Sequence, residues 1–341
     1  MIKPVFSDFM PQGSEIPSIQ KQIEENRLVH AVLITGQTGT GKRTLANLIA
    51  ASLLCHSESN KPCGCCNSCL MVSHSEHPDL IVVDKDIAPN GEIRKNKSSI
   101  PIDDIRAVIH LTSTYPFEGG NRVVIIRNAE DMTVQAQNCL LKILEEPPGN
   151  TFFILLSAHD DQLLSTVRSR CRTVRLKPWD ADYIEKILVA EGTDPKKAHD
   201  SALASHGSIG YAFKLSSDDD YWKSRQEIID SFLGISDRSQ ILSVSAKWKD
   251  RKQDADLIFS ILEDCIQNMI YIRINNSFTN SIDNFPKEWL LFSREAAYER
   301  FTFLLDRVRD ARMQNTFNVN FQAIIEQLLL AFIGEVEVWR K

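Results

Sequence analysis

The 341-residue sequence has no long apolar run and no excess of positive charge. No stretch approaches the roughly 20 apolar residues that a membrane-spanning helix requires, and residues 1–5 lack the apolar core of a secretory signal. We therefore expect a cytoplasmic protein with no membrane partner. The formal net charge of −6 argues against a protein that coats nucleic acids, although it leaves room for a local basic surface.

The sequence has few cysteines outside one short segment, because five of its eight lie between residues 55 and 69. Cys63, Cys66 and Cys69 are separated by two residues each, and Cys55 lies eight positions before Cys63. Four thiolates complete a closed, tetrahedral structural zinc site, and in a reducing compartment such a cluster favours metal over disulfides. Cys65 breaks the spacing and is either a spectator or a substitute for a neighbour. The alternative is a set of reduced thiols, or a pair able to oxidise.

A glycine-rich phosphate loop is present between an apolar run and a helical pattern. Its characteristic residues are Gly36, Gly39, Gly41 and Lys42, directly after the apolar run 31–35. In such a turn the backbone N–H groups and the lysine ammonium hold a polyphosphate. The sequence therefore predicts a phosphate-binding site where a helix over residues 42–54 begins.

The groups that would bind Mg²⁺ beside this loop are missing. The position after Lys42, where a Ser or Thr hydroxyl is expected, is Arg43. The apolar run 122–126 leads into Arg127 and Asn128 instead of two acids. Phosphoryl transfer depends on Mg²⁺ held by these groups and on a residue that orients the attacking water. Two guanidinium groups repel Mg²⁺, although they can neutralise a bound phosphate. We therefore expect no hydrolysis, while binding of ATP or ADP without hydrolysis stays open.

The other polar residues near this position are weaker candidates for a metal ligand. Thr44 comes one residue after the hydroxyl position, which turns its side chain about 100° around the helix. Glu130 and Asp131 are the nearest acids after the run. We expect both to face solvent, with no catalytic role.

The first half of the sequence alternates strand-like apolar runs with helical patterns, which predicts a parallel sheet with crossover helices. The expected strands are 31–35, 80–83, 123–126, 152–156 and 173–176. The expected helices are 42–54, 102–111 and one that is capped by Thr133 and ends before Pro147. Residues 85–99 have no periodicity and are expected to form an exposed loop.

The strand pattern stops near residues 177–179, and everything after it is helical in pattern. A short helical unit runs to about residue 213, and we interpret the acidic stretch 216–220 as a linker. Apolar stripes at helical spacing over 257–273 and 321–333 indicate a helical core, with part of a stripe open to a subunit interface.

Several segments together resemble one known family. They are the start of the first strand at 30–33, the cysteine insert after the phosphate-loop helix, the run Leu-Lys-Ile-Leu-Glu-Glu-Pro-Pro at 141–148, and Ser169-Arg170-Cys171. The sequence resembles the delta-prime family of bacterial clamp-loader subunits, within the AAA+ proteins. The resemblance is strong over residues 20–215 and weaker toward the C-terminus, where Asn318-Val319-Asn320 is similar to the family's collar domain.

The resemblance implies an α/β plus all-α chain with three domains. They are an AAA+ RecA-like domain with a five-stranded parallel sheet over 1–177, carrying the zinc-binding insert at 55–69, a small helical lid over 178–215, and a helical collar for oligomerisation over 221–341. It implies a rigid stator subunit of the DNA polymerase III holoenzyme that is no enzyme on its own. The implied partners are delta and gamma/tau subunits, the beta sliding clamp through the complex, and primed DNA within the assembly.

The resemblance also assigns a role to Arg170. The residue follows the run 165–168 just after an expected strand, which places it at a domain edge. By resemblance it is an arginine finger that acts in trans at the ATP site of a neighbouring gamma/tau subunit, where a guanidinium stabilises charge on the transferred phosphoryl group. The alternative is an ordinary salt-bridged arginine. Tyr211 stands where the lids of active members carry a nucleotide-sensing arginine.

Three competing interpretations stay open at this point. An active gamma/tau-type ATPase would need a Thr at position 43 and an Asp-Glu pair at 127 and 128. A nucleotide-binding scaffold outside replication would not capture clamp-loader subunits. A DNA-binding protein built on the cysteine cluster is disfavoured, because Lys61 is the single basic residue between 55 and 69.

Overall fold

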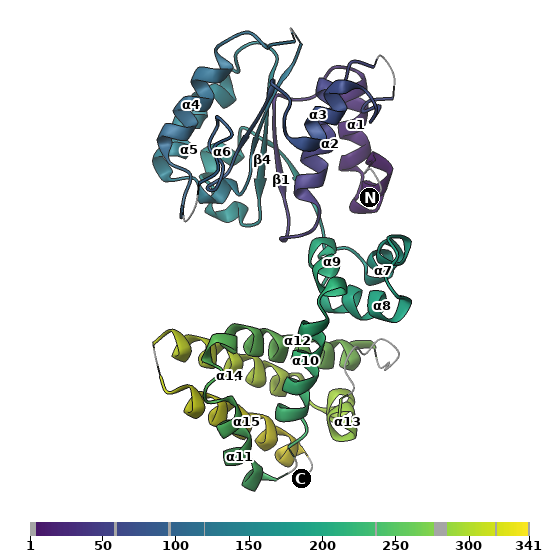
Figure 1. Ribbon diagram of the computed structural model, residues 1–341, viewed down its shortest axis with the longest axis vertical. Helices are drawn as coiled ribbons and strands as arrows, with labels where there is room; N and C mark the ends of the chain where they lie inside the picture. The colour runs from purple at the N-terminus through teal and green to yellow at the C-terminus, as the bar shows by residue number, and fades with distance from the viewer. Residues whose placement is uncertain are drawn as a thin grey trace. The chain divides into compact units, whose positions relative to one another are not determined.

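The computed structural model describes residues 5–57, 60–94, 97–118, 120–235, 237–275, 285–317 and 319–339 (Figure 1). The chain forms two compact units, Met1–Pro195 with Ser205–Ala212, and Lys196–Ala204 with Phe213–Lys341. Among the described helices, none combines the length and apolar character needed to cross a membrane. Residues 58–59 of the cysteine insert, 95–96 of the expected loop and Asn318 of the collar motif lie outside the described residues.

The first unit contains the five-stranded sheet that the sequence predicts, with every pairing parallel. The strands are β1 (Ala31–Thr35), β2 (Leu80–Val83), β3 (Arg122–Ile126), β4 (Thr151–Ser157) and β5 (Arg172–Arg175), in the order β2-β3-β4-β1-β5. The last strand ends one residue before the predicted end, at Arg175. Because the strands are parallel, their carboxyl ends share one edge, where Thr35 lies beside Ser157.

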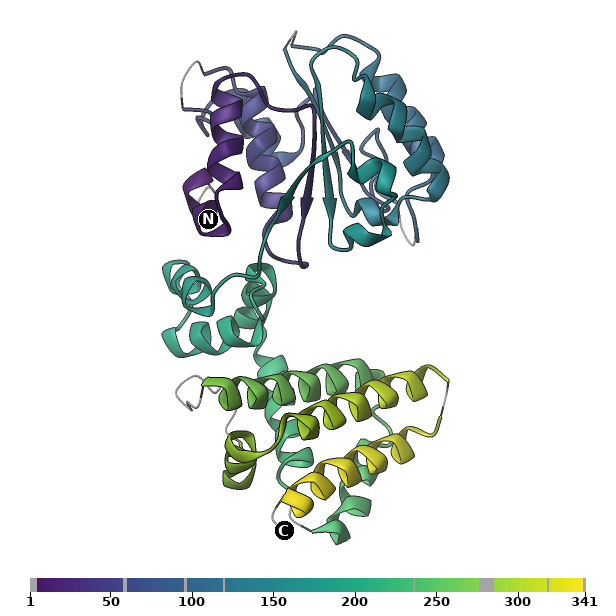
Figure 2. The same cartoon turned by 180° about the vertical axis from the view of Figure 1, so that it is seen from behind.

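Helices cover both faces of this sheet. Helices α1 (Glu15–Glu24), α2 (Lys42–Leu54) and α3 (Asn67–His74) lie on one side, and α4 (Ile102–Thr112), α5 (Val134–Glu145) and α6 (Ser165–Arg168) on the other (Figures 1 and 2). Short 3₁₀ turns η1 (Phe6–Gln12), η2 (Ala129–Asp131) and η3 (Asp160–Gln162) and helix α7 (Ala181–Ala190) complete the regular elements. The central strands β1 and β3 are buried along their whole length, as expected of strands covered on both faces.

The predicted helices of this unit are confirmed with small shifts at their ends. The Thr133 hydroxyl accepts a hydrogen bond from the Ala136 N–H and so caps α5. The helix ends at Glu145, before Pro147. In the expected loop, the described residues among 85–99 carry isolated bridges but no helix or strand.

The remainder of the chain is helical, as predicted. Its helices are α8 (Pro195–Ala204), α9 (Ile209–Ser217), α10 (Asp219–Phe232), α11 (Ile241–Trp248), α12 (Ala255–Asn275), α13 (Lys287–Glu295), α14 (Tyr298–Thr316) and α15 (Phe321–Trp339), with 3₁₀ turns η4 (Arg238–Gln240) and η5 (Lys252–Asp254). The apolar stripes of α12 and α15 are buried in one cluster with Trp248, Phe292 and Phe301. These stripes therefore form the core of the second unit.

The prediction of an acidic linker over 216–220 is wrong. Helix α9 runs to Ser217 and α10 begins at Asp219, so Asp218 alone separates them. The Asp218 carboxylate accepts a hydrogen bond from the Tyr221 N–H and caps α10. The acids therefore sit in the first turn of a helix, where the helix dipole favours negative charge.

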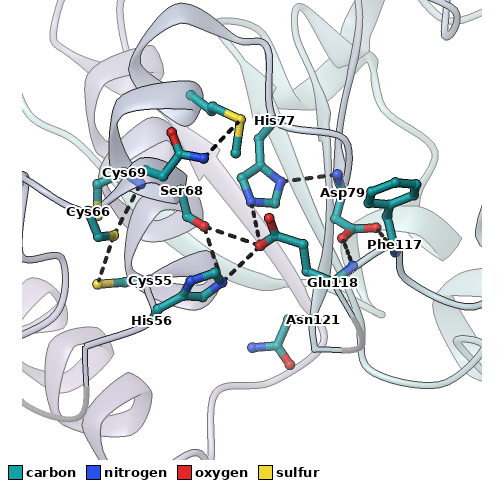
Figure 3. A network of polar contacts seen from close by, with 12 residues as sticks. Cys55, His56, Cys66, Ser68, Cys69, His77, Asp79, Phe117, Glu118 and Asn121 are labelled. Atoms are coloured by element: carbon teal, nitrogen blue, oxygen red, sulfur yellow. Dashed lines mark hydrogen bonds and ion pairs between the residues drawn. The ribbon is translucent and has the colours of Figure 1, made fainter.

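A buried ion pair fixes the loop that leads into β3. The Asp79 side chain is 1% exposed and that of Arg122 is 8% exposed, with Arg122 Nη2 3.2 Å from Asp79 Oδ1. The same carboxylate accepts hydrogen bonds from the N–H groups of Phe117 and Glu118, at 2.7 and 3.0 Å (Figure 3). The Arg122 guanidinium also donates to the carbonyl oxygens of Thr114 and Tyr115. The Asp79–Arg122 pair thus holds the turn before β3, because both side chains bond to backbone groups of that turn.

We expect Asp79→Ala to lower the free energy of unfolding of the first unit by about 3–5 kcal/mol, because it leaves a buried guanidinium without its counter-charge. Asp103→Ala is the matched control, since it breaks an exposed pair with Arg106 and should cost less than about 1 kcal/mol. Chemical denaturation followed by circular dichroism measures both. Equal losses in the two variants would contradict the structural role of the buried pair.

Candidate functional site

The phosphate loop lies between β1 and α2, as the sequence predicts. Gly36, Gly39 and Gly41 all have positive φ angles, and Gly41 begins α2 in the left-handed conformation. A Cβ atom on Gly36 would lie 2.5 Å from the carbonyl oxygen of Leu176. The loop therefore needs glycine where β1 turns past the end of β5.

Lys42 is folded back onto its own loop. Its Nζ donates to the carbonyl oxygens of Gly36 at 2.5 Å and Gln37 at 3.0 Å. Burial lowers the pKa of Lys42, and the nearby negative charge of Glu130 partly offsets that shift. The ammonium is thus held within the loop by the loop's own carbonyl oxygens.

The structure places arginine side chains where a metal cage would form. Arg127, the first residue after β3, is 7% exposed, and its Nε has no hydrogen-bond partner among the described residues. Burial lowers the pKa of Arg127 to about 10, and the positive charge of Arg43 adds to this effect. The Asn128 amide donates to Asp84 at 3.2 Å. Neither of the two residues that follow β3 offers a carboxylate to a metal.

The expectation that Glu130 faces solvent is wrong. Its Oε1 accepts a hydrogen bond from the Ala158 N–H at 2.8 Å, and its Oε2 is buried without a partner in the described structure. The cause is local, because Asn128 adopts a left-handed conformation and η2 turns the chain back over the strand ends. Asp131, by contrast, pairs with Lys85 at 3.3 Å. No spacing in the sequence signalled the return of Glu130.

A later segment of the same unit packs against the outside of the phosphate loop. The Gly210 N–H donates to the Gly39 carbonyl oxygen at 3.0 Å. The Trp179 indole N–H donates to the Thr40 carbonyl oxygen at 2.8 Å. Ser208 is buried against Gly39 and accepts a hydrogen bond from the Tyr211 N–H. Tyr211 therefore lies at the start of α9, next to the loop.

The structure brings the four predicted cysteines together. The sulfur atoms of Cys55, Cys63, Cys66 and Cys69 all lie within 4.8 Å of one another. Cys55 follows the end of α2, and Cys66 caps α3. Backbone N–H groups donate to these sulfurs, including Cys66 N to Cys63 Sγ at 3.3 Å and Cys69 N to Cys66 Sγ at 3.4 Å. This cluster is able to hold a metal ion.

The local environment shifts the pKa values of the thiols in different directions. Backbone N–H groups of residues 65 and 66 lower the pKa of Cys63 to about 6. Burial raises the pKa of Cys69 above its ordinary value. The Cys65 side chain is exposed and lies outside the four-sulfur cluster, so the geometry favours the spectator interpretation of this residue.

A polar network that the sequence analysis missed attaches the cysteine insert to the turn before β3 (Figure 3). The Glu118 carboxylate lies 2.8 Å from His56 Nε2 and 3.4 Å from His77 Nε2. The Ser68 hydroxyl donates to the same carboxylate oxygen at 3.2 Å. Asp79, which holds the Glu118 backbone, connects this network to the buried ion pair. The side chains of this network come from separate segments of the sequence, so no local motif predicts it.

Arg170 lies just beyond α6 and is tied to two neighbouring segments. Its Nε donates to Glu145 Oε1 at 2.7 Å, and Nη2 donates to the same oxygen. Its Nη1 donates to the Thr166 carbonyl oxygen at 2.9 Å. The side chain is 33% exposed, so the salt-bridged state that the sequence left open is present while the guanidinium still reaches the surface.

Comparison with known proteins places the chain in a family. The family model for the DNA polymerase III delta subunit matches residues 12–180. The Bacillus subtilis protein named DNA polymerase III subunit delta' is 28% identical over 317 residues, which cover 92% of this chain and 93% of that protein. The chain belongs to the DNA polymerase III delta' family. The predicted fold class, a parallel five-stranded sheet followed by helices, is confirmed by the structure.

Other relatives show how the match is distributed. The Escherichia coli subunit delta' is 35% identical over 201 residues, 58% of each chain. The Haemophilus influenzae tau/gamma subunit is 29% identical over 243 residues, 68% of this chain but 34% of that protein. A crystal structure of a DNA polymerase III gamma subunit-related protein from Thermotoga maritima covers 95% of this chain at 17% identity, with a TM-score of 0.47.

We expect Gly39→Ala to destabilise the first unit by about 1–3 kcal/mol more than Gly91→Ala does. The two glycines have φ angles of +81° and +82°, so the backbone strain is matched. A Cβ on Gly39 meets Ser208 Oγ at 2.0 Å, whereas nothing lies within 4 Å of one on Gly91. Thermal denaturation measures the difference, and adding Ser208→Gly to Gly39→Ala should recover part of it. Equal destabilisation would show that Ser208 does not hold the loop.

Proposed function

We propose that the chain is the delta-prime, or stator, subunit of a bacterial DNA polymerase III clamp loader and helps to load the beta sliding clamp onto primed DNA. Its membership of the delta' family supports this role. The observation that carries the stator assignment is Arg127, a buried cation at the strand end where an ATPase needs an acid. With Arg43 also replacing the loop hydroxyl, this subunit does not hydrolyse ATP by itself. The same two positions disfavour an active gamma/tau-type ATPase.

The proposed partners follow from the same family. We assign residues 1–177 to the AAA+ domain, 178–215 to the lid and 221–341 to a collar that assembles with delta and gamma/tau subunits. The helices of the second unit support a separate collar, because they bury their apolar stripes in a core of their own. The sliding clamp is reached through the complex, and primed DNA is contacted within the assembly.

Arg170 supplies the proposed contribution to catalysis, as an arginine finger in a neighbouring ATP site. Its three hydrogen bonds to Glu145 and Thr166 hold the guanidinium in one orientation. A guanidinium group that is already ordered loses little further conformational entropy when it binds a phosphate. Exchange of the Glu145 carboxylate for a phosphoryl oxygen would replace one charge-assisted hydrogen bond by another. This makes the salt bridge compatible with a finger.

We expect Arg170→Ala to remove turnover at the one ATP site that this subunit serves, because comparable fingers contribute factors of about 10³–10⁵. The measurement is the ATPase rate of the complex reconstituted with delta and gamma/tau. Arg168→Ala is the matched control, since it removes an exposed arginine from the end of α6, two residues before Arg170. Gel filtration should show unchanged assembly for both variants. ATPase and clamp-loading rates that match the control would remove this role from Arg170.

We also propose that the four-cysteine cluster holds a structural zinc ion. Tetrahedral zinc with Zn–S bonds of about 2.3 Å places its sulfurs about 3.8 Å apart. The Cys55–Cys66 and Cys63–Cys69 sulfur pairs lie 3.9 and 4.0 Å apart, so the site needs little adjustment. All four ligand positions are filled by thiolates, which leaves no position for a substrate. The ion would stabilise the insert rather than take part in chemistry.

We expect the freshly purified, reduced protein to contain one zinc ion per chain by elemental analysis. Cys66→Ser should abolish this content and lower the thermal midpoint, because structural zinc contributes directly to folding. Cys65→Ser is the matched control and should keep the full zinc content. Metal-free wild-type protein, or equal zinc loss in both variants, would contradict the assigned ligand set.

A further inference from the structure

The buried side chain of Arg127 lacks the partner that its charge requires. The residue is 7% exposed, and its Nε is buried with no hydrogen-bond partner among the described residues. A buried charge without a partner is costly, so proteins pair such groups or use them to bind an ion. Arg122, at the other end of the same strand, shows the usual solution in its pair with Asp79. The contrast indicates that the Arg127 guanidinium is available to bind an anion that is not part of the protein.

The position of Arg127 indicates where that anion lies. Ile126 pairs with Leu155, and Ile34 pairs with Leu156, so the residue after β3 and the loop after β1 share the carboxyl edge of the sheet. Ligands of parallel α/β sheets bind at this edge. Two further polar atoms here, Thr35 Oγ1 and Glu130 Oε2, are also buried without partners in the described structure. Three groups without partners in the described structure therefore follow or end strands at this carboxyl edge.

The charges around this position favour an anion over a metal ion. Lys42, Arg43 and Arg127 contribute three positive charges, and the positive charge of Arg43 acts directly on Arg127. Two carboxylates face them. Glu130 acts on Lys42 and holds Ala158, and Asp84 acts on Arg127 and accepts from Asn128. The balance is positive, and each carboxylate already accepts a hydrogen bond from the protein.

We propose that the phosphate loop binds a polyphosphate chain, as in ATP or ADP, without a divalent cation, and that Arg127 and Arg43 neutralise it in place of Mg²⁺. The inference deepens the proposed function and rests on its non-hydrolysing loop. Guanidinium groups make bidentate hydrogen bonds with phosphate oxygens. The loop N–H groups and Lys42 would then hold the chain as in other phosphate loops. The nucleotide would be a bound ligand and would not be consumed.

Equilibrium binding to the full-length, reduced protein tests the proposal. The probes are ATP, ADP, tripolyphosphate and orthophosphate, each titrated in excess EDTA and in excess Mg²⁺. We expect ATP, ADP or tripolyphosphate to bind. For each probe that binds, the dissociation constants measured in EDTA and in Mg²⁺ should agree within about twofold. Tighter binding of the nucleotides than of tripolyphosphate would identify a nucleotide site, and equal binding a general polyphosphate site. Binding of orthophosphate alone, or of no probe, would overturn the proposal.

Substitution of Arg127 tests whether this side chain contributes to polyphosphate binding. Arg127→Met should weaken binding in EDTA by about tenfold or more, since a charge-assisted contact is lost. Its thermal midpoint without ligand should not fall below that of wild type, because an apolar side chain replaces an unpaired buried charge. Arg106→Ala is the control, as it removes an exposed arginine on α4 and should leave binding unchanged. Equal binding by both variants would exclude Arg127 from the site.

The hydrolysis rate, measured in the same samples, separates this inference from the proposed function. Mg²⁺-dependent ATP hydrolysis that Lys42→Ala abolishes would overturn the non-hydrolysing stator itself. Binding that requires Mg²⁺, with no hydrolysis, would overturn the metal-free site alone. The double variant Arg43→Thr with Arg127→Asp provides a positive control for metal use, since it restores both magnesium ligands. Its ATP binding should become about tenfold tighter in Mg²⁺ than in EDTA.

Discussion

At the carboxyl end of β3, a buried guanidinium occupies the place where a phosphate-loop ATPase has an acid. The Nε atom of Arg127 has no hydrogen-bond partner among the described residues, and Arg43 adds a second positive charge beside it. This arrangement repels a divalent cation while the loop keeps its glycines and lysine. The proposed absence of self-catalysed turnover and the proposed metal-free polyphosphate site both depend on these two side chains.

The same sheet shows how differently two buried arginines are treated at opposite ends of β3. Arg122 is paired with Asp79, and that carboxylate also holds the turn that carries Glu118. Glu118 in turn contacts His56, directly after the first cysteine of the cluster. The cysteine insert is therefore attached to the sheet by polar contacts as well as by its own sulfurs. The arginine at the start of β3 is paired within the fold. The arginine after its end is the one that we propose binds a ligand.

The sequence predicted the features that depend on local pattern. Apolar runs located all five strands, and glycine spacing located the phosphate loop between β1 and α2. Cysteine spacing selected the four sulfurs that the fold brings together. Features that depend on backbone direction or on distant contacts were not accessible. Asn128 in a left-handed conformation begins the turn from which Glu130 contacts Ala158, and Asp218 caps a helix where an acidic run suggested a linker. The pairing of Arg170 with Glu145 spans two elements with no shared motif.

The phosphate loop also has a structural role that does not depend on hydrolysis. The Gly39 and Thr40 carbonyl oxygens accept hydrogen bonds from Gly210 and Trp179, and Gly39 has no room for a side chain against Ser208. The outer surface of the loop therefore holds the start of α9 through backbone geometry that needs no nucleotide. In an active ATPase, ligand exchange in such a loop changes the contacts of the helices around it. In the proposed stator, these contacts would hold the first unit in one arrangement whether or not a ligand is bound, because they join backbone and indole groups of the protein itself.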